Sequence, residues 1–190
     1  YRVGKIERKE KKRKALPPFN TSTLQQEAAR RLGFTSTRTM RVAQELYEGL
    51  NIGPEGSVGL VTYIRTDSFR VAGEAQAEAL KFIEERFGKD YVPEQPNIYK
   101  SRKSAQDAHE AIRPTSVYRT PESLKQALSR DQLRLYTLIW ERFVASQMAP
   151  AVFDTLGVEI VDHGLVFRAS SSNVRFPGYR VVYKDYDEDE

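Results

Sequence analysis

Hydrophobic residues recur every three or four positions through the middle of the chain, from about residue 20 to residue 149. This spacing is typical of amphipathic helices that bury one face. Glycine and proline interrupt the pattern and separate one helix from the next. We expect a first helix that Thr21-Ser22-Thr23 caps and Gly33 ends, further helices at Ser36–Tyr47, Gly73–Phe87 and Asp131–Met148, and a loop over Gly49–Gly59.

The pattern changes to a period of two at both ends of the chain, which predicts β-strands. The simplest arrangement is an α+β fold in which a helical domain is inserted into a β-rich domain. This interpretation assigns 1–19 and 150–184 to the β-rich domain, 20–149 to the helical domain and 185–190 to an acidic tail. We expect strands at about Tyr1–Glu10, Phe153–Val161, Leu165–Ala169 and Tyr179–Tyr183, with a hairpin turn at Asp162-His163-Gly164.

The composition is typical of a globular protein that does not cross a membrane. Of the 190 residues, 39% are hydrophobic and 29% are charged. The longest apolar run, Val58–Ile64, is far shorter than the ~20 residues that a membrane helix needs. The absence of cysteine excludes a disulfide framework and thiolate metal sites, which favours an intracellular protein. Because the sequence begins at Tyr1 rather than at methionine, we expect it to be part of a longer protein.

Charge is concentrated at the two ends, although the net charge of the chain is only +4. Residues 1–14 hold eight basic and two acidic side chains, a net +6, whereas the last ten residues carry a net −4. A basic run can bind a polyanion by releasing counterions, or it can form a solvated surface loop, and both interpretations stay open. In the acidic tail, Asp185 and Asp187 are spaced like two metal carboxylates, but nothing follows them to complete a ligand set. We therefore expect a linker there and no metal site.

The segment Gly59–Ser68 holds the first candidate chemistry. Its first half, Gly59–Ile64, is predicted to be a strand, which places Tyr63 near the strand end and Arg65 on the same face. A phenol whose pKa is about 10 needs a nearby cation or base to attack a phosphate, and a guanidinium group can hold phosphate oxygens in pairs. On spacing alone, a tyrosine and an arginine on a strand are more often structural than catalytic.

A second candidate group surrounds one of the two histidines. His109 lies in a stretch predicted to be helix-like until Pro114 ends it, with Glu110 beside it and Arg113 one turn away. The histidine could move a proton or donate a hydrogen bond to phosphate, and the arginine could add a positive charge. The alternative is a surface histidine beside an ordinary ion pair. We expect His163 to be structural, and no zinc site, because the two histidines are far apart and no H-E-x-x-H motif is present.

Four segments in a fixed order resemble those of bacterial type IA DNA topoisomerases. The stretch around Tyr63 resembles the segment of that family that carries the active-site tyrosine, and the other three resemble its upstream, downstream and later helical stretches. Together the matches extend over about residues 17–150. The segments are Pro18–Ala28, Gly59–Ser68, Ala108–Pro114 and Leu135–Trp140.

The resemblance implies a specific reaction. Tyr63 would attack a phosphodiester of single-stranded DNA and form a 5′-phosphotyrosine link, and religation after strand passage would relax negative supercoils without ATP. Arg65 would neutralise the phosphate. His109 would contact the DNA, with Arg113 and Asp67 supporting the site and Glu110 behind them. The family fold would make residues 20–149 a winged-helix-like unit inserted into a β-rich arch.

The resemblance also implies parts that this sequence lacks. Members of the family bind Mg²⁺ through acidic residues of a toprim domain, and a further domain holds the single strand beside the site. Neither is matched here, so we expect no cofactor on this chain, and we expect the chain alone to be inactive. Its partners would be single-stranded DNA and those missing domains, in the cytoplasm with the bacterial nucleoid and away from membranes.

Two other functions would also fit the candidate residues. One is a winged-helix-like module that binds nucleic acid without a covalent step. The other is a tyrosine recombinase, which is disfavoured because Tyr63 precedes His109 and Arg113 in the chain.

Overall fold

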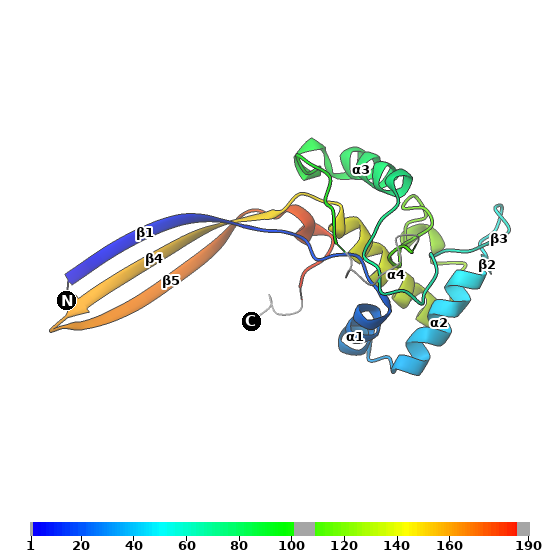
Figure 1. Cartoon of the computed structure of the whole chain (residues 1–190), viewed down its shortest axis with the longest axis horizontal. Helices are drawn as coiled ribbons and strands as arrows, with labels where there is room; N and C mark the ends of the chain where they lie inside the picture. The colour runs from blue at the N-terminus through cyan, green and yellow to red at the C-terminus, as the bar shows by residue number, and fades with distance from the viewer. Residues whose placement is uncertain (1, 101–108, 186–190) are drawn as a thin grey trace.

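A long three-stranded sheet projects from a group of helices in the computed structural model (Figure 1). The structure describes residues 2–100 and 109–185, so residues 186–190 of the acidic tail lie outside the described part of the chain. We call the sheet the arm and the remaining described residues the body. The fold is a mixture of α and β structure, which confirms this part of the sequence prediction, whereas the predicted domain boundaries stay a prediction.

The arm brings together strands from the two ends of the chain. Its order is β1-β4-β5 and all pairs are antiparallel, with β1 at Arg2–Arg13, β4 at Ala151–Asp162 and β5 at Leu165–Phe176. Each strand is longer than its pattern predicted. Hydrogen bonds between neighbouring strands also hold polar stretches, in which hydrophobic and polar residues do not alternate. The basic run is therefore largely a strand and not a surface loop.

A two-residue turn joins β4 to β5, as the sequence predicted. His163 and Gly164 form it, with φ values of +45° and +84°. Positive φ at both central residues is the geometry of a type I′ turn, whose twist suits a hairpin. His163 is thus a turn residue, as expected from the sequence.

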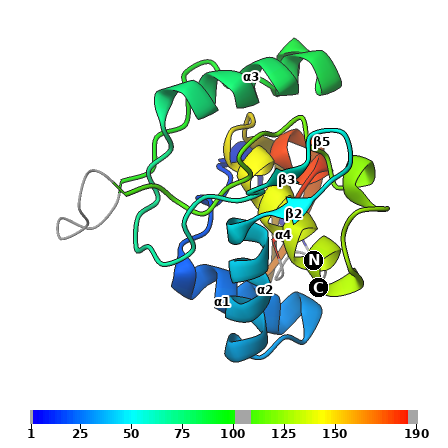
Figure 2. The same cartoon turned by 90° about the vertical axis from the view of Figure 1, so that its right-hand side faces the viewer.

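The body contains four α-helices, and their existence confirms the helical prediction. Figure 2 shows α4 at the centre, with α1 and α2 on one side and α3 on the other. The N-cap of the first helix differs from the prediction, because Asn20 occupies this position. The Oδ1 atom of Asn20 accepts from the Thr23 amide at 2.9 Å, and the Thr23 hydroxyl accepts from the Asn20 amide at 3.0 Å. The helices are α1 at Thr21–Leu32, α2 at Ser36–Glu48, α3 at Gly73–Phe87 and α4 at Arg130–Ser146.

The predicted strand at Gly59–Ile64 is wrong, because only Val61 forms a bridge, with Pro114. The segment is extended, but its hydrogen bonds go to different neighbours: Leu60 donates to the Leu46 carbonyl, at the end of α2. No continuous ladder can form along such a segment. The loop predicted at Gly49–Gly59 contains a short hairpin of β2 (Leu50–Asn51) and β3 (Ser57–Val58).

The helix-like stretch predicted around His109 is also wrong. Residues 109–114 run extended, and Ile112 forms a bridge with Phe19. The sequence pattern missed this pairing because the two residues that meet are far apart in the chain. The segment lies between the start of α1 and the segment that carries Tyr63.

The predicted strand at Tyr179–Tyr183 is instead a short 3₁₀ turn, η3, at Gly178–Val181. In a strand, Tyr179, Val181 and Tyr183 would lie on one face, but the structure buries the two tyrosines and leaves Val181 exposed. The sequence pattern alone could not show this difference. The turn begins where the Tyr179 amide donates to the Ala149 carbonyl at 3.0 Å. The chain thus folds back on the end of α4.

A buried arginine holds two of the three connections between arm and body. Arg142 of α4 is 5% exposed and donates to the Pro17 carbonyl at 2.6 Å and to the Tyr183 hydroxyl at 3.1 Å. Its guanidinium lies 4.6 Å from the centre of the Phe19 ring. The Tyr183 hydroxyl in turn donates to Glu27 at 2.9 Å. Burial raises the pKa of Tyr183 to about 12 although Arg142 is close, so its hydroxyl stays a donor at neutral pH.

A first prediction concerns Gly178, whose φ is +53°. A Cβ atom at this position would lie 2.6 Å from the Ala149 carbonyl oxygen, and the Pro150 carbonyl is as close. Gly178→Ala should therefore lower the free energy of unfolding by at least about 2 kcal/mol, because backbone atoms must move. Gly53→Ala is the control: φ is +93° but nothing lies within 4 Å, so about 1 kcal/mol is expected. Urea denaturation measures both, and equal losses would contradict the steric explanation.

A second prediction concerns Glu141, on α4. Burial raises the pKa of its carboxyl from 4.5 to about 7, and attraction by Arg31 only partly opposes this rise. The folded protein therefore holds a proton that the unfolded chain has lost, and stability should fall as pH rises between about 4.5 and 7. Glu141→Gln should raise the free energy of unfolding at pH 8 by about 1–3 kcal/mol and flatten that fall.

The control for Glu141 is Glu122→Gln, because the Glu122 side chain is 76% exposed and pairs with Lys125. This substitution should leave the pH dependence unchanged. Urea denaturation at pH 5, 6, 7 and 8 compares the two variants. Parallel curves for Glu141→Gln and the unsubstituted protein would show that the Glu141 carboxyl titrates normally.

Candidate functional site

The segment that carries Tyr63 is fixed on one side by a threonine hydroxyl. Thr62 donates from Oγ1 to the Ala111 carbonyl at 2.8 Å and accepts from the Arg113 amide at 3.0 Å. Its own amide donates to the Arg113 carbonyl at 2.9 Å. These bonds join the Tyr63 segment to residues 109–114, although about fifty residues separate them in the chain.

A second threonine fixes the other side of the same segment. Thr21, the first residue of α1, donates from Oγ1 to the Ile64 carbonyl at 2.7 Å and accepts from the Thr66 amide at 2.9 Å. The Thr21 amide, which has no partner inside its own helix, donates to the Thr66 carbonyl at 3.0 Å. The backbone on both sides of Tyr63 is therefore held, and the site does not depend on a regular strand.

Tyr63 and His109 line one small hollow. Its volume is about 190 Å³, and Tyr63 is 51% exposed. Within the described residues, the Tyr63 hydroxyl forms no hydrogen bond, so its oxygen is accessible to a substrate. The structure thus brings together the tyrosine and the histidine that the sequence singled out. The lining residues are Thr62, Tyr63, Thr66, His109 and Glu110.

Arg65 and Asp67 lie on the exposed side of the same segment and do not line the hollow. In the described parts of the chain, neither side chain forms a hydrogen bond or an ion pair. Arg65 is close to Tyr63 in sequence, but the shared strand face that the pattern predicted does not exist. Both charges are therefore available to a ligand in solution.

Arg113 is held inside the protein. Its side chain is 12% exposed and pairs with Glu110, with 3.0 Å between Nη2 and Oε2, and it also donates to the Pro114 carbonyl at 3.1 Å. Glu110 in turn accepts from the Ala72 amide at the start of α3, at 2.6 Å. This pair braces the wall of the hollow, and the positive charge of Arg113 is already balanced by a carboxylate.

Three residues that shape the site were not among the candidates for chemistry in the sequence. Thr21 and Thr62 hold the backbone, and the ring of Tyr47 lies edge-on to that of Tyr63, with 5.5 Å between centroids and 65° between planes. None of the three carries a charge, so charge and proton-transfer chemistry could not identify them. The two threonines lie in segments on which the family resemblance rests, which was the one available signal.

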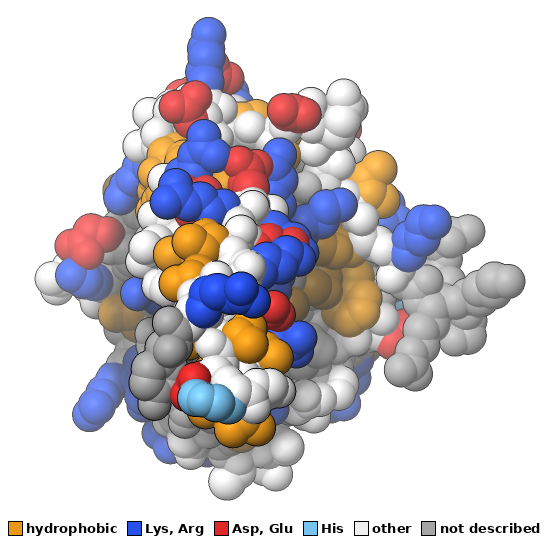
Figure 3. All heavy atoms as spheres, turned by 90° about the vertical axis from the view of Figure 1, so that its left-hand side faces the viewer, with side chains coloured by type: hydrophobic (Ala, Val, Ile, Leu, Met, Phe, Trp, Pro, Cys, Tyr) orange, Lys and Arg blue, Asp and Glu red, His pale blue; other side chains and the backbone are white. Residues whose placement is uncertain are grey.

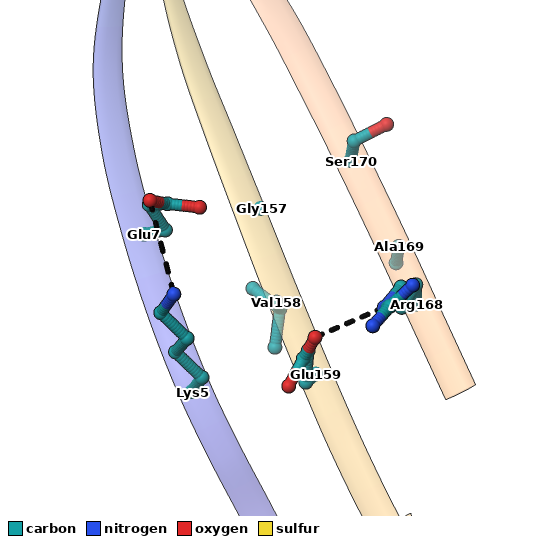
Figure 4. A pocket seen from close by; sticks show the side chains of 8 residues that line it. All are labelled: Lys5, Glu7, Gly157, Val158, Glu159, Arg168, Ala169 and Ser170. Carbon is teal, nitrogen blue, oxygen red and sulfur yellow. Dashed lines mark hydrogen bonds and ion pairs between the residues drawn. The ribbon is translucent and has the colours of Figure 1, made fainter. Parts of the chain in front are cut away.

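Three larger hollows among the described residues lie on or beside the arm. One of about 440 Å³ lies where Gly157 leaves space between its neighbours, and the pairs Lys5–Glu7 and Glu159–Arg168 border it (Figure 4). Seen from the tip of the arm, basic side chains alternate with acidic and hydrophobic ones (Figure 3). The cations at this hollow are matched by carboxylates, so it offers no concentrated charge for a substrate.

Two negative findings apply to residues 2–100 and 109–185. No three His, Cys, Asp or Glu side chains there lie close enough together to hold a metal ion. No helix in this part of the chain is long and apolar enough to cross a bilayer.

Known proteins similar to this chain are topoisomerases. The family model for DNA topoisomerase matches residues 1–190. The chain is 41% identical to full-length topoisomerase I from Thermotoga maritima, and the two structures agree with a TM-score of 0.83. The match covers 96% of this chain but 29% of the Thermotoga maritima chain. This chain therefore spans less than a third of the length of that protein.

A third prediction tests the hydroxyl of Thr62. Thr62→Val keeps the shape of the side chain but removes both hydrogen bonds, so the free energy of unfolding should fall by about 1–3 kcal/mol. Thr62→Ser keeps the hydroxyl and should lose less than about 1 kcal/mol. Urea denaturation measures stability, and hydrogen exchange at the Arg113 amide reports the local bond. Equal exchange in the two variants would show that the hydroxyl does not hold this segment.

Proposed function

Because the chain belongs to the bacterial type IA DNA topoisomerase family, we propose that Tyr63 is the nucleophile that cleaves DNA in the longer parent enzyme. The observation that carries this proposal is the position of the tyrosine. Its hydroxyl has no partner among the described residues and its half-exposed ring lines a hollow with His109, on a backbone held at both sides.

The proposed reaction exchanges one ester for another. The Tyr63 oxygen attacks the phosphorus of a single-stranded DNA backbone and loses its proton. The bond from phosphorus to the 3′ oxygen breaks, and that oxygen leaves as a 3′-hydroxyl after gaining a proton. The new 5′-phosphotyrosine ester keeps the energy of the broken bond, so the hydroxyl can attack back without ATP. Passage of another strand between the two steps relaxes negative supercoils.

The surrounding side chains suit this reaction to different degrees. Arg65 is exposed and uncommitted, so it can approach the phosphate and offset its charge. His109 can donate a hydrogen bond to the DNA from the wall of the hollow. Asp67 would support the position of Arg65. Arg113 acts on DNA only if the Glu110 pair loosens, and otherwise supports the site through its backbone.

The rest of the activity is assigned to other parts of the parent chain. Mg²⁺ would be held by a toprim domain, where it would offset charge at the phosphate, and another domain would hold the single strand. The arm would form part of a β-rich arch, and the body would be its winged-helix-like insertion. The parent would act in the cytoplasm, on nucleoid DNA. The isolated chain would be inactive, because the groups that activate Tyr63 lie outside it.

A fourth prediction tests the nucleophile. In the parent enzyme, Tyr63→Phe should abolish the covalent adduct with labelled single-stranded DNA after quenching with denaturant, because the attacking oxygen is gone. Tyr118→Phe is the matched control: Tyr118 is also exposed, but its hydroxyl bonds to Glu85 away from the hollow, and the adduct should form normally.

The isolated chain provides a second test of the same proposal. Incubated with supercoiled plasmid and Mg²⁺, it should leave the plasmid supercoiled. Relaxation that Tyr63→Phe abolishes would show that the chain needs no other domain. If Tyr63→Phe leaves adduct formation by the parent intact, the proposed chemistry is wrong, and a module that only binds nucleic acid becomes the better explanation.

A further inference from the structure

We propose that Tyr47 is a positioning residue that orients the ring of Tyr63 for attack, an inference that rests on the proposed function. The two rings meet edge to face, with 5.5 Å between centroids and 65° between planes. This arrangement is attractive for aromatic pairs because the positive edge of one ring approaches the negative face of the other. Tyr47 does not line the hollow beside Tyr63, so it contacts the nucleophile from outside the reaction space.

The backbone at Tyr47 is held firmly. It lies in the last turn of α2, and the preceding carbonyl, that of Leu46, accepts from the Leu60 amide at 2.8 Å. The carbonyl of Tyr47 lies so close to Gly59 that a Cβ atom there would be 2.9 Å away. Only glycine permits this approach without displacement of the backbone. The end of α2 and the segment leading to Tyr63 are therefore fixed to each other.

Tyr63 needs such a contact because its backbone alone is fixed. The two threonine hydroxyls determine where its Cα lies, but they do not determine the rotation of its side chain. Its hydroxyl has no partner within the described residues, and half of its ring is exposed. Among those residues, Tyr47 supplies the one ring contact to Tyr63.

Attack on a phosphate requires the tyrosine oxygen in line with the leaving oxygen. A small misplacement of a reacting group can lower a rate by up to about 100-fold. Loss of the Tyr47 ring should therefore slow the chemical step and leave DNA binding almost unchanged. Loss of the Tyr47 hydroxyl alone should have little effect, because the contact is between the two rings.

The test uses the parent enzyme with Tyr47→Ala, Tyr47→Leu and Tyr47→Phe. Single-turnover cleavage of a labelled single-stranded oligonucleotide gives the rate of adduct formation, and filter binding gives the Kd. We expect Tyr47→Ala to slow adduct formation about tenfold with less than about a twofold change in Kd. Tyr47→Leu should be slowed almost as much, and Tyr47→Phe should restore the normal rate.

Tyr118→Ala is the matched control, since it also removes an exposed ring that packs edge-on, against Phe82, away from the hollow. Its cleavage rate should be unchanged. A normal rate for Tyr47→Ala and Tyr47→Leu would overturn the positioning role, as would a slow Tyr47→Phe. If Tyr47→Ala does not fold, the leucine variant decides the question.

Failure of this inference is distinct from failure of the proposed function. A parent in which Tyr63→Phe abolishes the adduct but Tyr47→Leu does not slow it retains the proposed chemistry and loses only the role of Tyr47. A parent in which Tyr63→Phe still forms the adduct loses both. A crystal structure of the Tyr47→Leu parent should show the Tyr63 ring in a changed or mixed rotamer.

Discussion

The position of the arm on the body depends on one buried cation. Arg142 bonds to Pro17, on the chain that leaves β1, and to Tyr183, on the chain that follows β5, so a single side chain holds two of the three connections between arm and body. A buried guanidinium is tolerated only when its donors are satisfied and its charge is compensated. Two oxygen acceptors, the flanking rings of Phe19 and Tyr183, and nearby Glu27 supply these conditions. Removal of any one partner would leave the charge less well stabilised.

The same constraint reaches the candidate site through Phe19. Its ring packs on Arg142, and its carbonyl accepts from the Ile112 amide at 2.8 Å. Ile112 lies in the extended segment that bonds to Thr62, beside Tyr63. The tyrosine is thus connected to the junction of arm and body through one ring contact and a short series of hydrogen bonds. Rigid positioning comes here from bonds between distant segments and not from a continuous sheet.

Sequence reasoning predicted the features that depend on local pattern. The four helices follow from apolar spacing, and the turn at His163 and Gly164 follows from its residues. Residue chemistry also brought Tyr63 and His109 forward as candidates. The extended course of residues 109–114 could not be predicted, because its partners Phe19 and Thr62 lie far away in the chain. For the same reason, the sequence could not show that Tyr47 touches Tyr63.

Pairing of β1 with β4 gives the molecule a fixed order of assembly. Arg13 pairs with Ala151, so most of the body lies between two residues that are neighbours in the sheet. Closing so long a loop in an unfolded chain is entropically unfavourable and slow. Once the body has folded, its two ends already lie side by side, and the ladder can then close from the junction toward the tip. During synthesis β1 therefore emerges well before β4 and finds its partner only after residues 14–150 have been made.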